Sequence, residues 1–215
     1  KQDIANKYVH TITTKIDATN KKLISTYGDG TTAQIDLENL EQIGGRNLLR
    51  NSAITKENLK YWIASSATKS IENVDGENCL KIVSTENHGV YGDMNAGINN
   101  LYPGKIYTYS FWIKSNVAKP FNHSSIGHYQ TVISGSLHVS TNRSFYPDTI
   151  PANTWTKAIC KFTVSSQCRF VPYIWYLGNG TTVWVKDIKL EEGNEATDWT
   201  PAPEDLAYLN SSPTF

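Results

Sequence analysis

The most regular stretch of the sequence is Ile106-Tyr107-Thr108-Tyr109-Ser110-Phe111-Trp112-Ile113-Lys114-Ser115. Large apolar residues alternate in it with smaller or polar ones, which is the period of a β-strand with one buried face. The better core face comprises Tyr107, Tyr109, Phe111 and Ile113. Trp112 falls on the other face, between Ser110 and Lys114, so it is predicted to point away from the core.

The same period of two continues through the rest of the chain after Asn47. Further strands are predicted at 79–84, 89–94, 129–139, 154–164, 169–177 and 182–190. Turn signals such as Asp75-Gly76 and Gly178-Asn179-Gly180 separate them. Seven or more strands without helical patterns between them predict an all-β protein, and their length favours a two-sheet antiparallel jelly-roll β-sandwich over about residues 46–205.

The segment before Gly44-Gly45 has a different period. Val9, Ile12, Ile16 and Leu23 are spaced by 3, 4 and 7 residues, which predicts a short helix within about residues 3–26. A helix this short is marginal alone, so it either packs on the domain or associates with copies of itself as an oligomeric stalk. The expected division is a helical connector at 1–45, the sandwich at 46–205 and a tail at 206–215.

Composition limits the classes of partner. The 215 residues include 20 Lys+Arg and 20 Asp+Glu, so the net charge is zero, which argues against nucleic acid or an anionic membrane as the main partner. No apolar run approaches the ~20 residues that cross a bilayer, so no membrane insertion is expected. The chain begins without Met and is expected to be a fragment or a processed product. With 11% aromatic residues, it suits a neutral polar ligand.

Reactive centres are poorly represented. Cys79, Cys160 and Cys168 form no CxxC, and 160 and 168 are read as flanking a hairpin turn out of register with each other, so free thiols are expected. The five histidines show no zinc spacing. Most carboxylates cluster in turns and at the chain ends rather than as a pair flanking a sugar bond, and GxSxG and P-loop motifs are missing. We therefore expect no enzyme.

Three segments carry a family resemblance. They are Gly44-Gly45-Arg46-Asn47-Leu48-Leu49-Arg50-Asn51-Ser52, residues 104–115, and Val183-Trp184-Val185-Lys186-Asp187-Ile188-Lys189-Leu190-Glu191-Glu192-Gly193 with its continuation to Asp205. Together they resemble the jelly-roll carbohydrate-binding module of tail and baseplate proteins of phages that infect Gram-positive bacteria, such as lactococcal siphophage baseplate accessory proteins. The resemblance implies non-catalytic binding of host cell-wall saccharide, a place in the virion, and contacts with other baseplate or tail proteins.

Saccharides present apolar ring faces edged with hydroxyls, so a protein binds them with exposed aromatic rings and hydrogen-bonding side chains. The predicted aromatic contacts are Trp112, Trp175, Trp184, Tyr129 and Tyr146, with Trp112 foremost. The predicted polar contacts are Asn122, His128, Gln130 and His138. The resemblance also implies a possible structural Ca²⁺ beside Asp187, and the alternative is a hydrogen-bonded Asp187 near Asn51.

Two other functions stay open at this point. The chain is alternatively the binding module of a larger cell-wall hydrolase, or a virion decoration domain that binds no sugar. The heptad pattern before Gly44 argues against the hydrolase, because hydrolase linkers are usually flexible and rich in Gly, Ser and Pro. The outward aromatic residues argue against the decoration domain.

Overall fold

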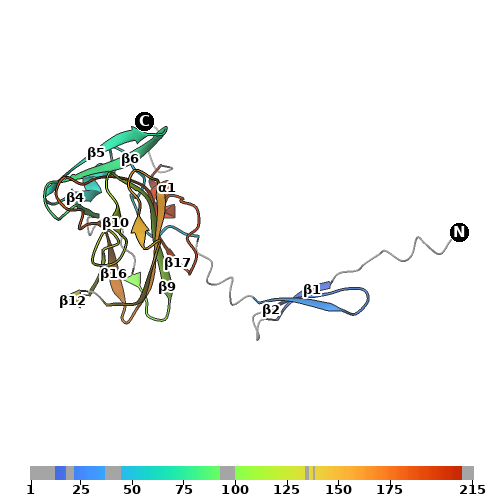
Figure 1. The fold of residues 1–215 in the computed structure, drawn as a ribbon. Helices are drawn as coiled ribbons and strands as arrows, with labels where there is room; N and C mark the ends of the chain where they lie inside the picture. The colour runs from blue at the N-terminus through green and yellow to red at the C-terminus, as the bar shows by residue number, and fades with distance from the viewer. Residues whose placement is uncertain are drawn as a thin grey trace. The chain divides into compact units, whose positions relative to one another are not determined.

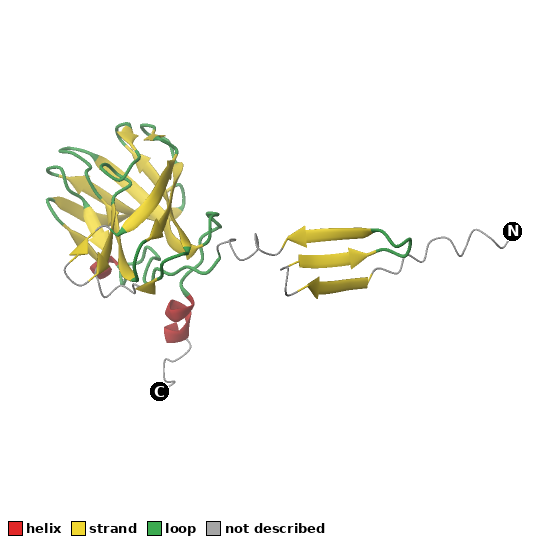
Figure 2. Ribbon diagram, turned by 90° about the horizontal axis from the view of Figure 1, so that it is seen from below, coloured by secondary structure: helices red, strands yellow, loops and turns green. Residues whose placement is uncertain are grey.

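The structure, a computed structural model, describes residues 13–17, 22–36, 45–92, 100–133, 136–137 and 139–209. The chain divides into two compact units, Lys1–Ile43 and Gly44–Phe215, and each is described by itself. Figure 2 shows strands in both units and helix only in short pieces. Among the described residues, no helix has both the length and the apolar character that crossing a membrane requires.

The first unit contains a three-stranded antiparallel sheet, and the helix predicted within residues 3–26 is not supported. Its strands are β1 (Thr13–Asp17), β2 (Lys22–Thr26) and β3 (Thr32–Asp36), in that order across the sheet. Residues 3–12 of the prediction lie outside the described residues. The described part is rich in Thr and Ile, whose branched side chains favour strands. Between β2 and β3, Asp29 accepts hydrogen bonds from the backbone and hydroxyl of Thr31, and this turn closes the hairpin.

The second unit is built from two six-stranded antiparallel sheets, which confirms the predicted antiparallel β-sandwich (Figure 1). Sheet I has the order β13-β15-β9-β17-β6-β5. Its strands are β5 (Ala67–Val74), β6 (Glu77–Ser84), β9 (Ile106–Ser115), β13 (Ser140–Tyr146), β15 (Thr156–Val164) and β17 (Thr182–Glu192).

Sheet II has the order β12-β11-β16-β7-β4, and β8 also pairs with β16. Its strands are β4 (Trp62–Ala64), β7 (Val90–Gly92), β8 (Asn100–Leu101), β11 (Tyr129–Ile133), β12 (Ser136–Leu137) and β16 (Cys168–Ile174). Outside the two sheets lie a short pair, β10 (Lys119–Pro120) with β14 (Thr149–Ile150), the 3-10 turn η2 (Leu59–Tyr61) and the helix α1 (Pro203–Leu209).

The core lies between the sheets and contains many aromatic rings. Tyr109 of β9 packs against Phe170 of β16 with ring centres 5.1 Å apart, and Tyr129 of β11 stacks on Phe162 of β15 at 4.6 Å. The face assignment of β9 is confirmed, since Tyr107, Tyr109, Phe111 and Ile113 are all buried and Trp112 is only half-buried. In β17, Val183 and Val185 likewise point inward.

Two details of the sequence interpretation are wrong. The segments at 154–164 and 169–177 do not form a hairpin, because β15 belongs to sheet I and β16 to sheet II. The second error concerns Tyr129, which was predicted as a surface contact. It is fully buried, because the β11 register places it opposite Pro172 on the core side.

The expectation of free thiols is confirmed, since Cys79, Cys160 and Cys168 are buried and unbridged.

Candidate functional site

The outer face of sheet II carries a group of aromatic rings that touch one another. In β16, Phe170 and Ile174 point into the core, and the alternation of the strand puts Val171 and Tyr173 on the opposite face. Tyr173 is therefore on the outer face, and Trp175 follows it just beyond the end of the strand. The register pairs Tyr173 with Tyr91 of β7, which brings the second tyrosine onto the same face.

Four rings make up this group, which we call the aromatic platform: His88, Tyr91, Tyr173 and Trp175. Tyr91 and Tyr173 stack at 5.2 Å with 17° between their planes. Trp175 stands nearly perpendicular to both, at 5.9 Å from Tyr91 and 5.2 Å from Tyr173. His88 stacks on Trp175 at 4.9 Å and 16°. All four rings are half-buried, so each keeps part of its surface open while its neighbours fix its orientation.

Polar groups border the platform. His128 is nearly buried and meets Tyr173 and Tyr176 edge to face at 5.1 Å. Gln130 of β11 is half-buried beside β16, opposite Val171. Tyr176 has a positive φ of 53°, a conformation that non-glycine residues rarely adopt and that recurs at ligand sites. Burial raises the pKa of Tyr173, so its hydroxyl stays protonated and available as a donor.

The remaining predicted contacts lie apart from the platform or outside the described residues. Tyr146 of β13 is 71% exposed at the edge of sheet I. Asn122 is exposed in the loop after β10, and its side-chain oxygen accepts a hydrogen bond from the Ser124 backbone. His138 lies outside the described residues. The structure thus brings together Trp175, His128 and Gln130 from the predicted set.

The outer face of sheet I holds the other predicted tryptophans, each with different neighbours. Trp184 donates its indole N–H to Glu72 at 3.2 Å, and the Lys81 ammonium lies 5.7 Å from its ring centre. Trp112 lines a hollow of about 220 Å³ together with Lys157 and Asp187. Both tryptophans point outward as predicted, but neither makes a ring-to-ring contact within the described residues.

Part of this face is covered by the chain itself. Lys189 and Glu191 of β17 form an ion pair of 3.2 Å and are both essentially fully buried. Thr197 donates its backbone N–H and its hydroxyl to Glu191, at 2.9 and 2.6 Å. Lys189 also donates to the carbonyl of Asp198 at 2.9 Å. This network pins the segment after β17 over the sheet and removes that area from any ligand.

Asp187 is the predicted metal ligand, and its surroundings do not match calcium well. It sits at a bulge in β17 with a φ of 54°, and burial raises its pKa. Calcium takes six to eight oxygens. Asp198 lines the same hollow, but Lys157 does too, and no three His, Cys, Asp or Glu side chains gather as a metal site in the described part of the chain. The alternative, a carboxylate hydrogen-bonded near Asn51, is not seen either: it is Asp205 that accepts a bond from the Asn51 backbone. Calcium at Asp187 stays a prediction.

Three of the four platform residues escaped the sequence analysis. The pattern around Tyr91 is too short for a clear alternation because β7 has only three residues, and His88 precedes that strand. Tyr173 lies in the predicted strand 169–177, where both faces carry large apolar residues, so the sequence pattern does not identify the outer face. The sequence does contain one signal, the two aromatic residues Tyr173 and Trp175 at alternate positions. Only the register between β7 and β16 shows that Tyr91 lies beside them.

Comparisons with known proteins found similarity in structure but not in sequence. No family model and no curated protein matches the chain. The CBM22-1 xylan-binding domain from Paenibacillus barcinonensis is 10% identical with a TM-score of 0.44, covering 69% of this chain and 94% of that one. A variant of a family 29 carbohydrate-binding module is 14% identical with a TM-score of 0.42, covering 73% and 99%.

A phage protein is also among the similar structures. The tripod from the baseplate of bacteriophage Tuc2009 is 17% identical with a TM-score of 0.37, covering 84% of this chain and 65% of that one. The chain therefore resembles both carbohydrate-binding modules and a phage baseplate assembly. These TM-scores all lie below 0.5, so the similar structures do not indicate a ligand for this chain. The side chains of the platform are the features that indicate one.

Proposed function

We propose that this chain binds saccharide without cleaving it, and that the aromatic platform on sheet II is the binding site. The observation that carries the proposal is the mutual packing of four half-buried rings, His88, Tyr91, Tyr173 and Trp175, on one outer face. Rings held by their neighbours lose little conformational freedom on binding, so they offer apolar area to a sugar face at low entropic cost.

The hydrogen bonds come from the border of the platform. Gln130, His128 and the Tyr173 hydroxyl offer donors and acceptors to the hydroxyl edge of a sugar ring. Each such bond replaces a bond to water, so its net contribution is small, and a single site is expected to bind in the micromolar to millimolar range. Useful attachment then requires several copies, since linked sites gain ~10²–10⁴ in avidity.

The proposed target is host cell-wall saccharide, and the proposed place is the tail or baseplate of a phage that infects Gram-positive bacteria. Support comes from the resemblance of Gly44–Ser52 and of residues 183–205 to the baseplate modules. Other baseplate or tail proteins are then the partners. Because the described part of the first unit is a sheet and not a helix, we propose that any self-association occurs through this sheet. Measuring the molar mass of the full chain in solution tests whether it self-associates.

A hydrolase module and a decoration domain remain the competing functions. The platform argues against decoration, because a domain that binds nothing has no need to keep four rings open to solvent. Hydrolysis by this chain is tested by incubation with wall polysaccharide. We expect no increase in reducing ends over a blank, and a steady increase with time would contradict the non-catalytic proposal.

The direct test is a calorimetric titration of the full chain with polysaccharide released from lactococcal cell walls. We expect the wild type to bind and Trp175→Ala to bind at least about tenfold more weakly, which corresponds to ~1.4 kcal/mol. Tyr102→Ala is the matched control, because Tyr102 is 51% exposed and belongs to no ring cluster in the described structure. Equal loss in both variants, or no loss in Trp175→Ala, would refute the platform as the site.

A further inference from the structure

Away from the platform, three hollows meet at Trp199. Their volumes are about 790, 280 and 220 Å³. The first two share Ala53, Thr55 and Trp199 in their walls, and the last two share Asp187 and Trp199. The three hollows therefore adjoin one another around Trp199, and we call them together the Trp199 groove. It runs from the loop before β4, past the segment after β17, onto the outer face of sheet I.

Aromatic rings are spaced along this groove. Tyr61 lines the largest hollow, Trp112 lines the smallest, and Trp199 lines all three. All three rings are half-buried. Trp199 donates its indole N–H to Ser52 at 3.2 Å, so its ring is held in place while part of it stays open.

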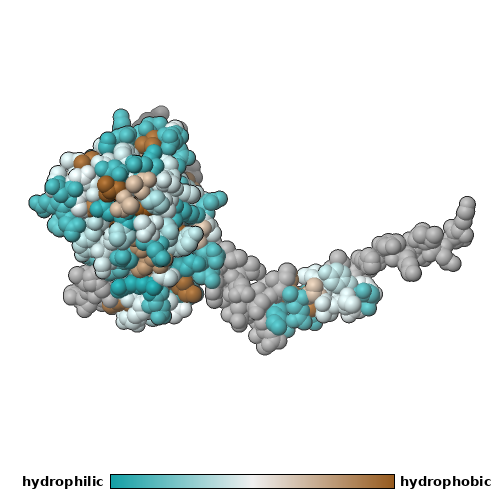
Figure 3. Space-filling view, in the orientation of Figure 1, coloured by the Kyte–Doolittle hydropathy of each residue, from teal (hydrophilic) through white to brown (hydrophobic). Residues whose placement is uncertain are grey.

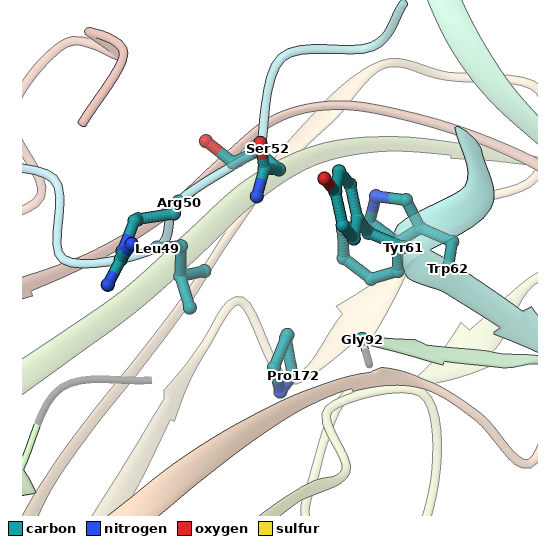
Figure 4. Close-up of a pocket in the computed structure, with 8 residues that line it drawn as sticks. Leu49, Arg50, Ser52, Tyr61, Trp62, Gly92 and Pro172 are labelled. Atoms are coloured by element: carbon teal, nitrogen blue, oxygen red, sulfur yellow. The ribbon is translucent and has the colours of Figure 1, made fainter. Parts of the chain in front are cut away.

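The narrow inner end of the groove indicates how a ligand would lie. Tyr61 also lines a crevice of about 10 Å³, which has room for about one water molecule. Figure 4 shows the loop residues on one side of it, Tyr61 and Trp62 on the other, and two strands across the end, with the labelled residues Leu49, Arg50, Ser52, Tyr61, Trp62, Gly92 and Pro172. A sugar ring cannot enter this crevice, so a ligand must run along the groove rather than into it.

The polar groups of the groove favour a neutral ligand rich in hydroxyls. Asp187 is half-buried, lines two of the hollows and makes no hydrogen bond within the described residues, so its carboxylate has acceptor positions available to a ligand. Lys157 already donates to the Ala196 carbonyl at 3.2 Å, and Lys186 pairs with Glu77. The acids lining the groove, Glu57, Glu77, Asp187, Asp198 and Asp205, outnumber the bases Arg50, Lys157 and Lys186, which disfavours an anionic ligand.

We propose that the Trp199 groove is a second saccharide site, which takes a neutral, extended oligosaccharide along Tyr61, Trp199 and Trp112. In this arrangement a sugar hydroxyl donates to Asp187, which supplies the hydrogen bond that the carboxylate lacks. The groove shares no described residue with the platform, so one molecule can hold a polymer at two places. Two linked sites raise the residence time on a polysaccharide without new contacts at either site.

The test uses the full chain carrying Trp175→Ala, which weakens the platform, labelled with ¹⁵N. Lactococcal wall polysaccharide, xylohexaose and cellohexaose are added separately while the indole N–H signals of Trp112 and Trp199 are followed. We expect at least one of these probes to shift both signals. Adding Tyr61→Ala should reduce that binding at least about threefold, and adding Tyr102→Ala should leave it unchanged.

The outcomes separate this inference from the proposed function. If the Trp112 and Trp199 signals shift in the Trp175→Ala chain while the platform signals of the wild-type chain do not, the groove is supported as a site and the platform is refuted. If the platform signals move and the groove signals stay fixed with every probe, the groove is refuted. If Ca²⁺ alone moves the signals around Asp187 and no saccharide does, the depression is a cation site, and the saccharide proposal is likewise overturned. If no probe shifts the signals of either the platform or the groove, both proposals are overturned.

Discussion

On the outer face of sheet II, Tyr91, Tyr173 and Trp175 contact one another, whereas on the outer face of sheet I the tryptophans contact charged groups. Trp184 lies between Glu72 and Lys81, and Trp155 donates to Asp75 while Lys186 lies over its ring. The same residue type therefore has two roles in one sandwich. Rings that pack on rings keep open apolar surface, and rings that pack on ion pairs become part of the polar surface of the fold.

Strand pairing produces this difference. Tyr173 is opposite Tyr91 in the register of β16 and β7, so two rings share one side of the sheet. Trp184 of β17 is opposite Lys81 on one side and Lys114 on the other. Figure 3 shows a mostly hydrophilic visible face of the sandwich with small, separate apolar patches. Cross-strand neighbours, rather than the exposure of one residue, decide whether an outward aromatic belongs to a binding surface.

The largest effect is expected on the face of sheet I, in stability. Lys189→Met leaves Glu191 charged and buried without its ammonium partner, so the free energy of unfolding should fall by about 3–5 kcal/mol. Urea unfolding of the wild type and the variant measures this difference. A variant that keeps its stability would show that the covering segment is not fixed by this network.

The next largest effect is expected in saccharide binding, and it compares a tryptophan on the outer face of sheet II with one on the outer face of sheet I. Trp175→Ala should weaken polysaccharide binding at least about tenfold, whereas Trp184→Ala should change it by less than about twofold, because Trp184 is engaged with Glu72 and Lys81. Titration calorimetry on both variants gives the ratio. The opposite ranking would move the binding surface to sheet I.

A smaller effect concerns Asp187 and pH. Its pKa is raised above the ordinary 3.8 by burial, so the folded state holds this proton more tightly than the unfolded state. The stabilisation is complete below the ordinary value and is lost as the pH rises through the raised one. Asp187→Asn lacks this loss and should become more stable relative to the wild type between pH 3 and pH 7. Parallel melting curves across that range test the sign, and a constant difference would contradict it.

The smallest effect is expected from metal removal. Because Lys157 and Lys186 line the same hollows as Asp187 and already place positive charge there, chelator should shift the melting temperature by less than about 1 °C. A fall of several degrees that added Ca²⁺ reverses would instead establish calcium at Asp187. Asp187→Asn is the control, because it should abolish any such reversal.

The sandwich was predictable because the large apolar residues of β9, together with Val183 and Val185 of β17, recur at every second position and lie in the core. The first unit was not, because Val9, Ile12, Ile16 and Leu23 fit a heptad by spacing while the described segments are rich in β-branched residues that pair as strands. Spacing over fewer than three heptads is weak evidence when the residue types favour strands.

The site was predictable only in part. Trp175 was identified, but Tyr129 was assigned to the wrong face because Tyr129–Ile133 alternates large and polar residues too weakly to fix its inner side. Tyr91 and Tyr173 are 82 residues apart (173 − 91) and meet only through the β7–β16 register. That register depends on the packing of the whole sheet, so no local pattern could show it.

The most direct measurement of the central claim is one NMR titration of the ¹⁵N- and ¹³C-labelled wild-type chain with lactococcal wall polysaccharide, following both outer faces at once. The account predicts that the signals of Tyr91, Tyr173 and Trp175 shift together and saturate along one curve, while those of Trp155 and Trp184 stay fixed. Shifts confined to Trp155 and Trp184, with the platform signals unmoved at saturation, would contradict it.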